Sequence, residues 1–157
     1  MSHRPYFHLR KILNEASCDP CWPSGIRLAA FEPDKHAVDA HQCLTAAFAQ
    51  GGGSVPPFEQ WWTTLRSDPE FEATLFFIAV DAEGQIAGLA QCWSSGFIKD
   101  LAVALEWRRR GLGQALLLHV FACFRQRGAP HVDLKVERDN PSGAARLYHR
   151  AGMKALA

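Results

Sequence analysis

The chain has 157 residues, of which 48% are hydrophobic and 21% charged, and its formal net charge is +1. This length and composition predict one globular domain with a buried core and exclude a disordered chain. The balance of charge argues against general nucleic-acid binding, which needs a basic excess. No apolar run approaches the roughly 20 residues of a membrane helix, and residues 1–17 lack the apolar core of a secretory signal. We therefore expect a cytoplasmic protein with neither nucleic acid nor membrane as a partner.

The cysteines and histidines predict no metal site and no disulfide framework. The chain has five cysteines, an odd number in a chain large enough to have a core. Cys18 and Cys21 form a C-x-x-C pair, but no second pair follows at the spacing of a zinc site. His36 and His41 are five residues apart, a spacing that does not align them on one helix face. Ordinary thiols and no metal are the expectation.

The first 25 residues are interpreted as an N-terminal extension to a domain over 26–157. Residues 5–13 favour a short amphipathic helix, which the prolines and the glycine of 18–25 then interrupt. No known domain pattern covers this extension, so it enters the fold prediction only as an addition to the main domain.

From residue 26 onward, hydrophobic periodicity and turn residues predict a regular series of elements. The expected elements are a strand over 26–33, helices over 34–50 and 58–67, strands over 74–81, 85–93 and 97–105, a helix over 112–127, a strand over 131–137 and a helix over 141–152. Asp34 is the expected N-cap of the first helix. This order predicts an α/β layered domain with a mixed sheet, in which hairpins give antiparallel pairs and one β-α-β crossover gives a parallel pair.

The stretch EWRRRGLGQALL over 106–117 places charge and two glycines between a predicted strand and a predicted helix. Glycine allows close backbone approach to a ligand, and the first N–H groups of a helix attract anions. The stretch therefore predicts a pyrophosphate site. A phosphate-binding Walker loop would need Lys followed by Ser or Thr, and the dinucleotide fingerprint fails because Leu116 stands where a third glycine belongs.

The six residues Arg108 to Gly113 do fit a third pattern, [Arg/Gln]-x-x-Gly-x-[Gly/Ala]. They resemble the acyl-CoA loop of the GCN5-related N-acetyltransferases, the GNAT superfamily. The segment NPSGAARLYHRAGM over 140–153 is similar to the Asn-x-x-x-Ala…Leu-Tyr-x-x-x-Gly segment on the far side of that family's site. The resemblance extends over 74–153. It implies a mixed, mostly antiparallel sheet flanked by helices around a β-α-β acyl-CoA-binding core.

The chain departs from this family pattern at its C-terminal end. The family usually adds two strands after the last helix, whereas here there is room for one short strand at most. The resemblance therefore implies one of three arrangements: a shortened domain, a sheet closed by the N-terminal extension, or a sheet closed by a partner chain. An uncovered sheet edge favours association, and a homodimer is one expectation.

The resemblance implies acetyl-CoA as co-substrate and assigns residues to it. Backbone N–H groups over 109–114 would bind the pyrophosphate, and a backbone N–H near Leu101–Val103 would polarise the thioester carbonyl. Asn140 matches a position that commonly contacts the pantetheine arm. The cofactor-binding residues implied are Leu101, Ala102, Val103, Arg108, Arg109, Arg110, Gly111, Leu112, Gly113, Gln114 and Asn140.

Tyr148 matches the tyrosine with which family members often protonate the departing thiolate. The acceptor amine must also lose a proton, and here the candidates are Asp100 on the 97–105 strand, Glu137, or a chain of water molecules. Some relatives place a glutamate one residue before Asp100, where this chain has Lys99. One of the adjacent tryptophans 61 and 62 is expected to line the acceptor pocket, because both cannot face inward on one helix.

These observations predict an N-acetyltransferase that moves an acetyl group from acetyl-CoA to a primary amine of a small molecule or a protein by direct attack. Two alternatives stay open. A non-catalytic acyl-CoA-binding or sensing module would keep the 108–113 loop without turnover. A different nucleotide-binding domain would prefer ATP or NAD to acetyl-CoA.

Overall fold

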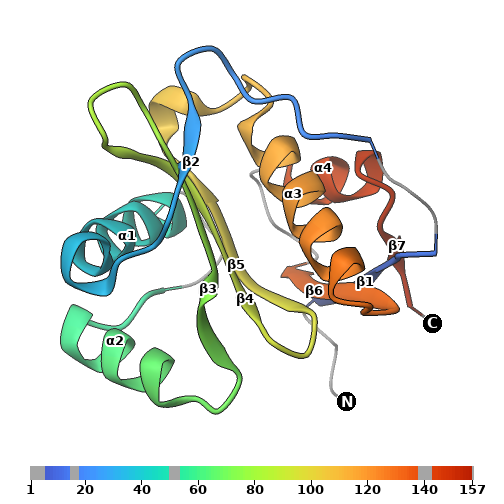
Figure 1. The fold of residues 1–157 in the computed structure, drawn as a ribbon, viewed down its shortest axis with the longest axis horizontal. Coiled ribbons are helices and arrows are strands. Elements are labelled where there is room, and N and C mark those ends of the chain that lie inside the picture. Colours follow the sequence, from blue (N-terminus) through green and yellow to red (C-terminus); the bar gives the residue numbers. More distant parts are fainter. Residues whose placement is uncertain (1–5, 15–17, 50–53, 138–142, 157) are drawn as a thin grey trace.

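The computed structural model describes residues 6–14, 18–49, 54–137 and 143–156. Within these ranges one sheet of seven strands, ordered β2-β3-β4-β5-β6-β1-β7, lies between four α-helices (Figure 1). The strands are β1 (Tyr6–Ile12), β2 (Arg27–Ala29), β3 (Phe71–Val80), β4 (Ile86–Trp93), β5 (Phe97–Val103), β6 (His131–Glu137) and β7 (Lys154–Ala155). The helices are α1 (Pro33–Phe48), α2 (Phe58–Ser67), α3 (Leu112–Gln126) and α4 (Ala144–Arg150).

The sheet is mixed and mostly antiparallel, as the sequence predicts. Strands β5 and β6 are the parallel pair, joined through α3 by the expected β-α-β crossover. The pairs β2–β3, β3–β4, β4–β5, β1–β6 and β1–β7 are antiparallel. The predicted fold class is therefore confirmed.

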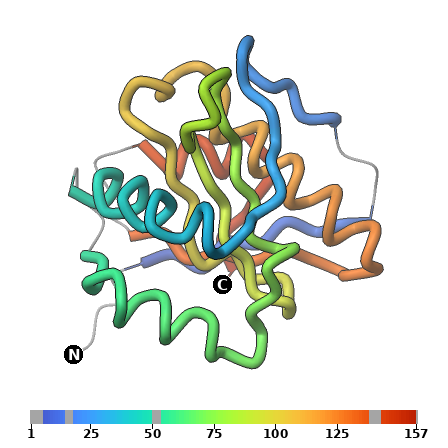
Figure 2. The backbone as a smooth tube through the Cα atoms, turned by 60° about the vertical axis from the view of Figure 1, so that its left-hand side comes forward, coloured from blue at the N-terminus to red at the C-terminus, as the bar shows by residue number. Residues whose placement is uncertain are grey.

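Helices cover both faces of the sheet and bury a core on each. Helices α1 and α2 pack on one face, and α3 and α4 pack on the other (Figures 1 and 2). Leu116 and Phe121 of α3 are fully buried in the core on the side of α3 and α4, and Leu44 and Trp61 are buried in the core on the side of α1 and α2. Because both faces of β3 and β4 are covered, these strands are nearly continuous apolar runs without alternation.

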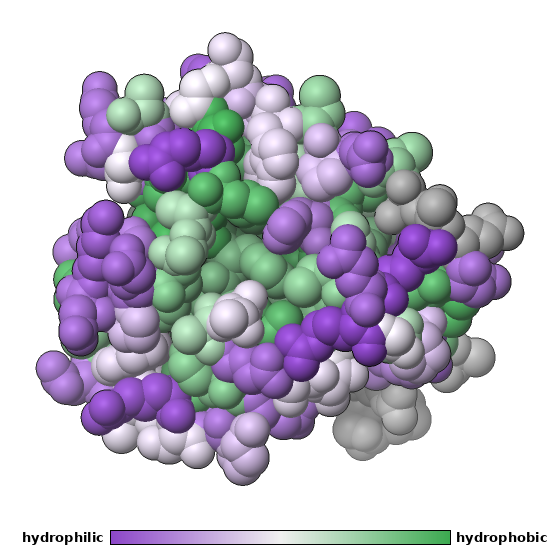
Figure 3. All heavy atoms as spheres, viewed as in Figure 1, coloured by the Kyte–Doolittle hydropathy of each residue, from purple (hydrophilic) through white to green (hydrophobic). Residues whose placement is uncertain are grey.

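Hydrophobic side chains also gather in the middle of the face seen in Figure 3, with hydrophilic side chains around them. Within the described ranges, no helix is long and apolar enough to cross a membrane. The same residues contain no group of three or more His, Cys, Asp or Glu side chains placed to hold a metal ion.

The N-terminal segment is a strand, so the prediction of an amphipathic helix over 5–13 is wrong. Residues 6–12 form β1, which pairs antiparallel along the whole of β6. Leu9 is buried in the α3-side core. On the opposite face of β1, Arg10 donates two hydrogen bonds to the Asp133 carboxylate, with N···O distances of 2.8 and 2.9 Å. Pairing with a distant strand and this ion pair override the local helical preference.

The edge of β6 is thus covered by the chain's own N-terminal segment, one of the three arrangements that the sequence left open. The short strand β7 then pairs with β1 through Lys154 and Ala155. The predicted N-cap also differs: α1 begins at Pro33 with Glu32 as its N-cap, and Asp34 lies in the first turn. Proline suits the first helical position because its fixed φ matches the helix.

Candidate active site

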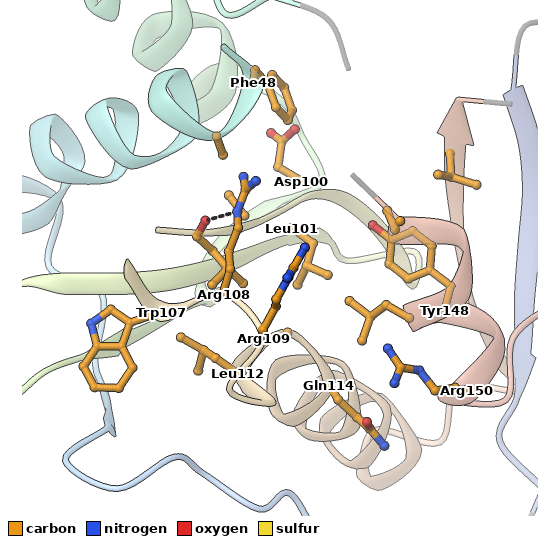
Figure 4. Close-up of a pocket in the computed structure, with 18 of the residues that line it drawn as sticks. Phe48, Asp100, Leu101, Trp107, Arg108, Arg109, Leu112, Gln114, Tyr148 and Arg150 are labelled. Carbon is orange, nitrogen blue, oxygen red and sulfur yellow. Dashed lines mark hydrogen bonds between the residues drawn. The ribbon is translucent and has the colours of Figure 1, made fainter. Parts of the chain in front are cut away.

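The candidate active site is a cleft at the point where β5 and β6 separate. These parallel strands pair over only two residues each, where Phe97 lies opposite Asp133 and Ile98 opposite Leu134. Beyond that point a cleft of about 780 Å³ opens between them. Its walls come from the second halves of both strands, the first turn of α3, helix α4 and the end of α1 (Figure 4).

The loop before α3 has the backbone geometry of an anion site. Arg109 has a φ of +62° and Gly111 a φ of +85°, so the chain turns twice through the left-handed region within three residues. Helix α3 then begins at Leu112. The Ala115 amide donates the first hydrogen bond of the helix to the Gly111 carbonyl. The amides of residues 112–114 therefore have no intrahelical acceptor and are free to donate to a ligand. The positive end of the helix dipole lies at the same place and further favours an anion there.

The two glycines of the loop have different physical roles. A Cβ at Gly111 would meet no atom within 4 Å, so its positive φ is what requires glycine there. A Cβ at Gly113 would lie only 2.9 Å from Leu147 Cδ2 of α4. Gly111 thus shapes the anion-binding cradle, formed by the 108–113 loop and the amides of residues 112–114, and leaves it open. Gly113 lets α4 pack closely against the start of α3.

The three consecutive arginines also separate in space. Arg108 donates from Nε to the Val103 carbonyl at 3.2 Å, which ties the loop to the end of β5. Arg110 stacks over the Trp107 ring at 4.9 Å and does not line the cleft. Arg109 lines the cleft and extends toward Leu101 in Figure 4. Arg108 lines the cleft as well, but its Nε is engaged by the Val103 carbonyl, whereas no hydrogen bond ties the Arg109 side chain among the contacts described for this loop.

Strand β5 carries a β-bulge beside the cleft. Gln91 of β4 lies opposite Asp100, but its neighbour Cys92 lies opposite Ile98, so Lys99 is an extra residue on β5. Such a residue leaves the regular ladder and bends its strand. The bulge explains how Ile98 and Leu101, three residues apart, both pack toward the α3-side core.

The side chains of β5 after the bulge point alternately to the two faces. Leu101 and Val103 pack toward α3, whereas Ala102 is buried with α1 and α2. All three residues line the cleft, which brings the backbone segment predicted to polarise a thioester carbonyl to its wall.

Tyr148 and Asp100 line this cleft from α4 and β5 (Figure 4). Tyr148 is 8% exposed and Asp100 is 9% exposed. Burial, and to a lesser degree the negative charge of Asp100, raises the pKa of Tyr148 to about 12. The Asp100 Oδ2 atom accepts a hydrogen bond from Lys99 Nζ at 2.8 Å. A neutral phenol, which can donate a proton, and a carboxylate, which can accept one, thus line the same cleft.

This raised pKa predicts a distinct alkaline titration. Tyr148 is one of only two tyrosines. Subtracting the phenolate absorbance of a Tyr148→Phe variant from that of the wild type isolates the signal of Tyr148. We expect this difference to stay flat through about pH 10, where an ordinary tyrosine is half ionised. It should rise only toward pH 12. Because the folded pKa lies above the unfolded value, the associated stability is complete below about pH 10 and is lost as pH rises through 12. A half-developed difference at pH 10 would contradict the burial of this phenol.

Other predicted site residues are placed as follows. Glu137 lies at the end of β6 and lines the cleft as an exposed carboxylate. Asn140 lies outside the described residues. Neither adjacent tryptophan lines the cleft: Trp61 is buried in the core with α1, and Trp62 packs beside Phe31 and Phe71.

The sequence alone missed several residues of the cleft. Phe48 reaches it from the end of α1, Lys135 from β6 and Arg150 from the end of α4. A basic residue in the last turn of a helix is common because it faces the negative end of the dipole. Nothing in the local pattern of Arg150 therefore distinguished it from a surface residue.

Diverging parallel strands, a glycine-shaped helix start and a buried tyrosine together define the cleft of a GNAT-type acyltransferase. Comparison with known proteins agrees, since the family model described as the acetyltransferase (GNAT) family matches residues 30–153. The chain belongs to this family, which confirms the resemblance drawn from the loop and the tyrosine segment.

Two kinds of relatives are similar over most of the chain. The mycothiol acetyltransferase of Salinispora tropica is 32% identical over 166 residues, covering 95% of this chain and 51% of that protein. The mycothiol acetyltransferase of Clavibacter michiganensis is 36% identical over 139 residues, covering 86% of this chain and 44% of that protein. A solved GCN5-related N-acetyltransferase from Sphaerobacter thermophilus superposes with a TM-score of 0.81 at 30% identity, covering 96% of this chain and 48% of that one. The chain thus spans about half the length of the curated relatives it matches.

Proposed function

We propose that this domain transfers an acetyl group from acetyl-CoA to a primary amine of a small molecule by direct attack. The observation that carries the proposal is the cleft itself, which joins the amides at the start of α3 to Tyr148 and Asp100. A small acceptor, rather than a protein, is supported by relatives named for mycothiol and, at 37% identity over 81 residues, for streptothricin.

The loop and the start of α3 would hold the co-substrate. The amides of residues 112–114 donate to the pyrophosphate, Arg109 adds positive charge, and the bare Cα of Gly111 permits close approach. The backbone of β5 beyond the Lys99 bulge donates to the thioester carbonyl, where negative charge develops as the amine attacks. A thioester supplies an acyl group that already carries a good leaving group. The protein has to orient the thioester, accept a proton from the amine and donate a proton to the departing thiolate.

Asp100 and Tyr148 divide the two proton transfers between them. The Asp100 carboxylate accepts a proton from the acceptor amine, which attacks only in its neutral form. Tyr148 remains protonated at neutral pH because its pKa is raised to about 12, so it is available to donate to the departing thiolate.

Thermal unfolding with and without acetyl-CoA, beside ATP and NAD, tests the binding half of this proposal. Ligand that binds the folded chain raises its stability by RT ln(1 + [L]/Kd), about 2.7 kcal/mol at a hundredfold excess over Kd. We expect acetyl-CoA to raise Tm by several degrees and ATP and NAD to leave it unchanged. No shift with acetyl-CoA, or a larger shift with ATP or NAD, would contradict the assignment of the 108–113 loop.

Turnover tests the catalytic half. A panel of small primary amines is incubated with acetyl-CoA and the enzyme, and the free thiol of CoA is measured. The control is the Tyr148→Phe variant, which should bind acetyl-CoA with little thiol release. Acetyl-CoA binding without turnover of any amine would instead favour a non-catalytic acyl-CoA-binding module.

A further inference from the structure

Lys99 places a primary amine inside the candidate active site. As the extra residue of the β5 bulge, it lines the same cleft as Tyr148 and Asp100. Its Nζ lies 2.8 Å from Asp100 Oδ2, with the lysine side chain 37% exposed and the aspartate side chain 9% exposed. Lys99 is thus a primary amine, the class of group that the enzyme is proposed to acetylate. It lies in hydrogen-bond contact with Asp100, the carboxylate proposed to receive the proton.

We propose that Lys99 is itself an acetyl acceptor, so that the enzyme acetylates its own active-site lysine in cis. This inference rests on the proposed function, because it uses the same co-substrate and the same proton transfers. It assigns a covalent modification site to Lys99 and a second substrate, the chain's own side chain, to the cleft.

The step balances without any further reactant. The Lys99 ammonium passes one proton to Asp100 Oδ2, its hydrogen-bond partner, and the lone pair set free forms the N–C bond with the acetyl carbonyl carbon. The nitrogen then releases a second proton to solvent as the amide forms. The C–S bond to CoA breaks, and the sulfur takes a proton from the Tyr148 hydroxyl. The products are Nε-acetyllysine and CoA, and the proton on Asp100 returns to Tyr148 through solvent.

Acetylation of Lys99 would also change the site. An acetylated lysine carries no charge, so it no longer forms an ion pair with Asp100. The Asp100 carboxylate would then be available to the ammonium group of a free acceptor. The Lys99–Asp100 ion pair thus links self-modification to the state of the proposed proton acceptor.

Two other lysines provide matched comparisons. Lys135 lines the same cleft from β6, but its Nζ lies 5.0 Å from the centre of the Tyr6 ring, in a cation–π contact. Lys35 has a carboxylate partner, Glu32 Oε2 at 4.0 Å, but it lies in the first turn of α1 outside the cleft lining. Lys99 alone of these three combines the cleft with a close carboxylate.

The experiment incubates the full chain with isotopically labelled acetyl-CoA and follows the label at each lysine by peptide mass spectrometry. The label separates new acetylation from any acquired during expression. We expect Lys99 to be labelled at least about tenfold faster than Lys35 or Lys135, because positioning alone accelerates intramolecular reactions by more than this. The labelling rate per chain should not depend on protein concentration, as expected for transfer in cis.

Two variants complete the test. Tyr148→Phe should slow labelling of Lys99 at least about tenfold, because the departing thiolate loses its proton donor, and should leave labelling of Lys35 unchanged. Lys99→Arg keeps the cation beside Asp100 and should remove the labelled peptide without moving the label to Lys135.

The inference is overturned if Lys99 is labelled no faster than Lys35, or if its rate rises in proportion to protein concentration. Parallel assays of acetyl-CoA binding and amine turnover separate the two proposals. Slow labelling of Lys99 in an enzyme that turns over free amines leaves the proposed function standing. Absence of acetyl-CoA binding removes both.

Discussion

Replacing Tyr148 by phenylalanine is expected to lower kcat by about 10²–10⁴-fold, the usual contribution of a positioned general acid. The buried ring keeps its volume and its packing on α4, and only the hydroxyl that donates to the departing thiolate is lost. Affinity for acetyl-CoA should stay within about twofold of the wild type, because an interaction made only in the transition state alters kcat and not binding. Steady-state kinetics at saturating acetyl-CoA and calorimetric titration measure the two quantities separately.

Tyr6→Phe is the matched control for this substitution. Tyr6 is the other tyrosine of the chain, 39% exposed on β1 and outside the lining of the cleft. The same chemical change at Tyr6 should leave kcat unaltered. If Tyr148→Phe retained the wild-type rate, the thiolate would have to leave without help from this phenol, and the role proposed for Tyr148 would fall.

Much of the fold is predictable because apolar runs in this chain are separated by clear turn residues. The predicted strand over 131–137 and the predicted helix over 58–67 match β6 and α2 at both ends. The predicted strand over 97–105 is too long by two residues, since β5 ends at Val103 and a 3₁₀ turn over Leu105–Trp107 follows. Local composition decides where these elements begin, and tertiary contacts adjust where they end.

The N-terminal strand shows where local reasoning fails. Within YFHLRKI nothing selects a strand over a helix until β6 is present as a partner. The contacts that stabilise β1 join residues far apart in sequence: Leu9 lies opposite Leu134, and Arg10 binds Asp133. The closing of the sheet by this segment is therefore a property of the whole fold.

The candidate site likewise has features that the sequence predicts and features that depend on tertiary contacts. The glycine loop was predictable because its chemistry is local: a left-handed turn followed by the open amides of a helix. The separate directions of Arg108 and Arg110 were not, because they depend on the Val103 carbonyl and the Trp107 ring. The approach of Lys99 to Asp100 likewise depends on a bulge that only pairing with β4 reveals.

Replacing Gly111 by alanine is expected to weaken acetyl-CoA binding by at least about tenfold, which corresponds to 1.4 kcal/mol. Gly111 has a φ of +85°, and a non-glycine residue in that region costs about 1–2 kcal/mol. Any relaxation of this strain turns the amides of residues 112–114 away from the bound pyrophosphate. If the backbone holds its place, the new Cβ still occupies open space at the wall of the cleft, where the ligand approaches.

Gly128→Ala separates loss of the cradle from loss of stability. Gly128 has a φ of +81°, its Cβ would also meet nothing within 4 Å, and it follows the opposite end of the same helix, away from the cleft. Both variants should lose a similar free energy of unfolding in urea, about 1–2 kcal/mol. Only the Gly111 variant should lose affinity for acetyl-CoA in calorimetric titration at a temperature where both are folded. Equal losses of affinity in the two variants would mean that general destabilisation, and not the turn at the start of α3, governs binding, and the cradle would have to be sought elsewhere.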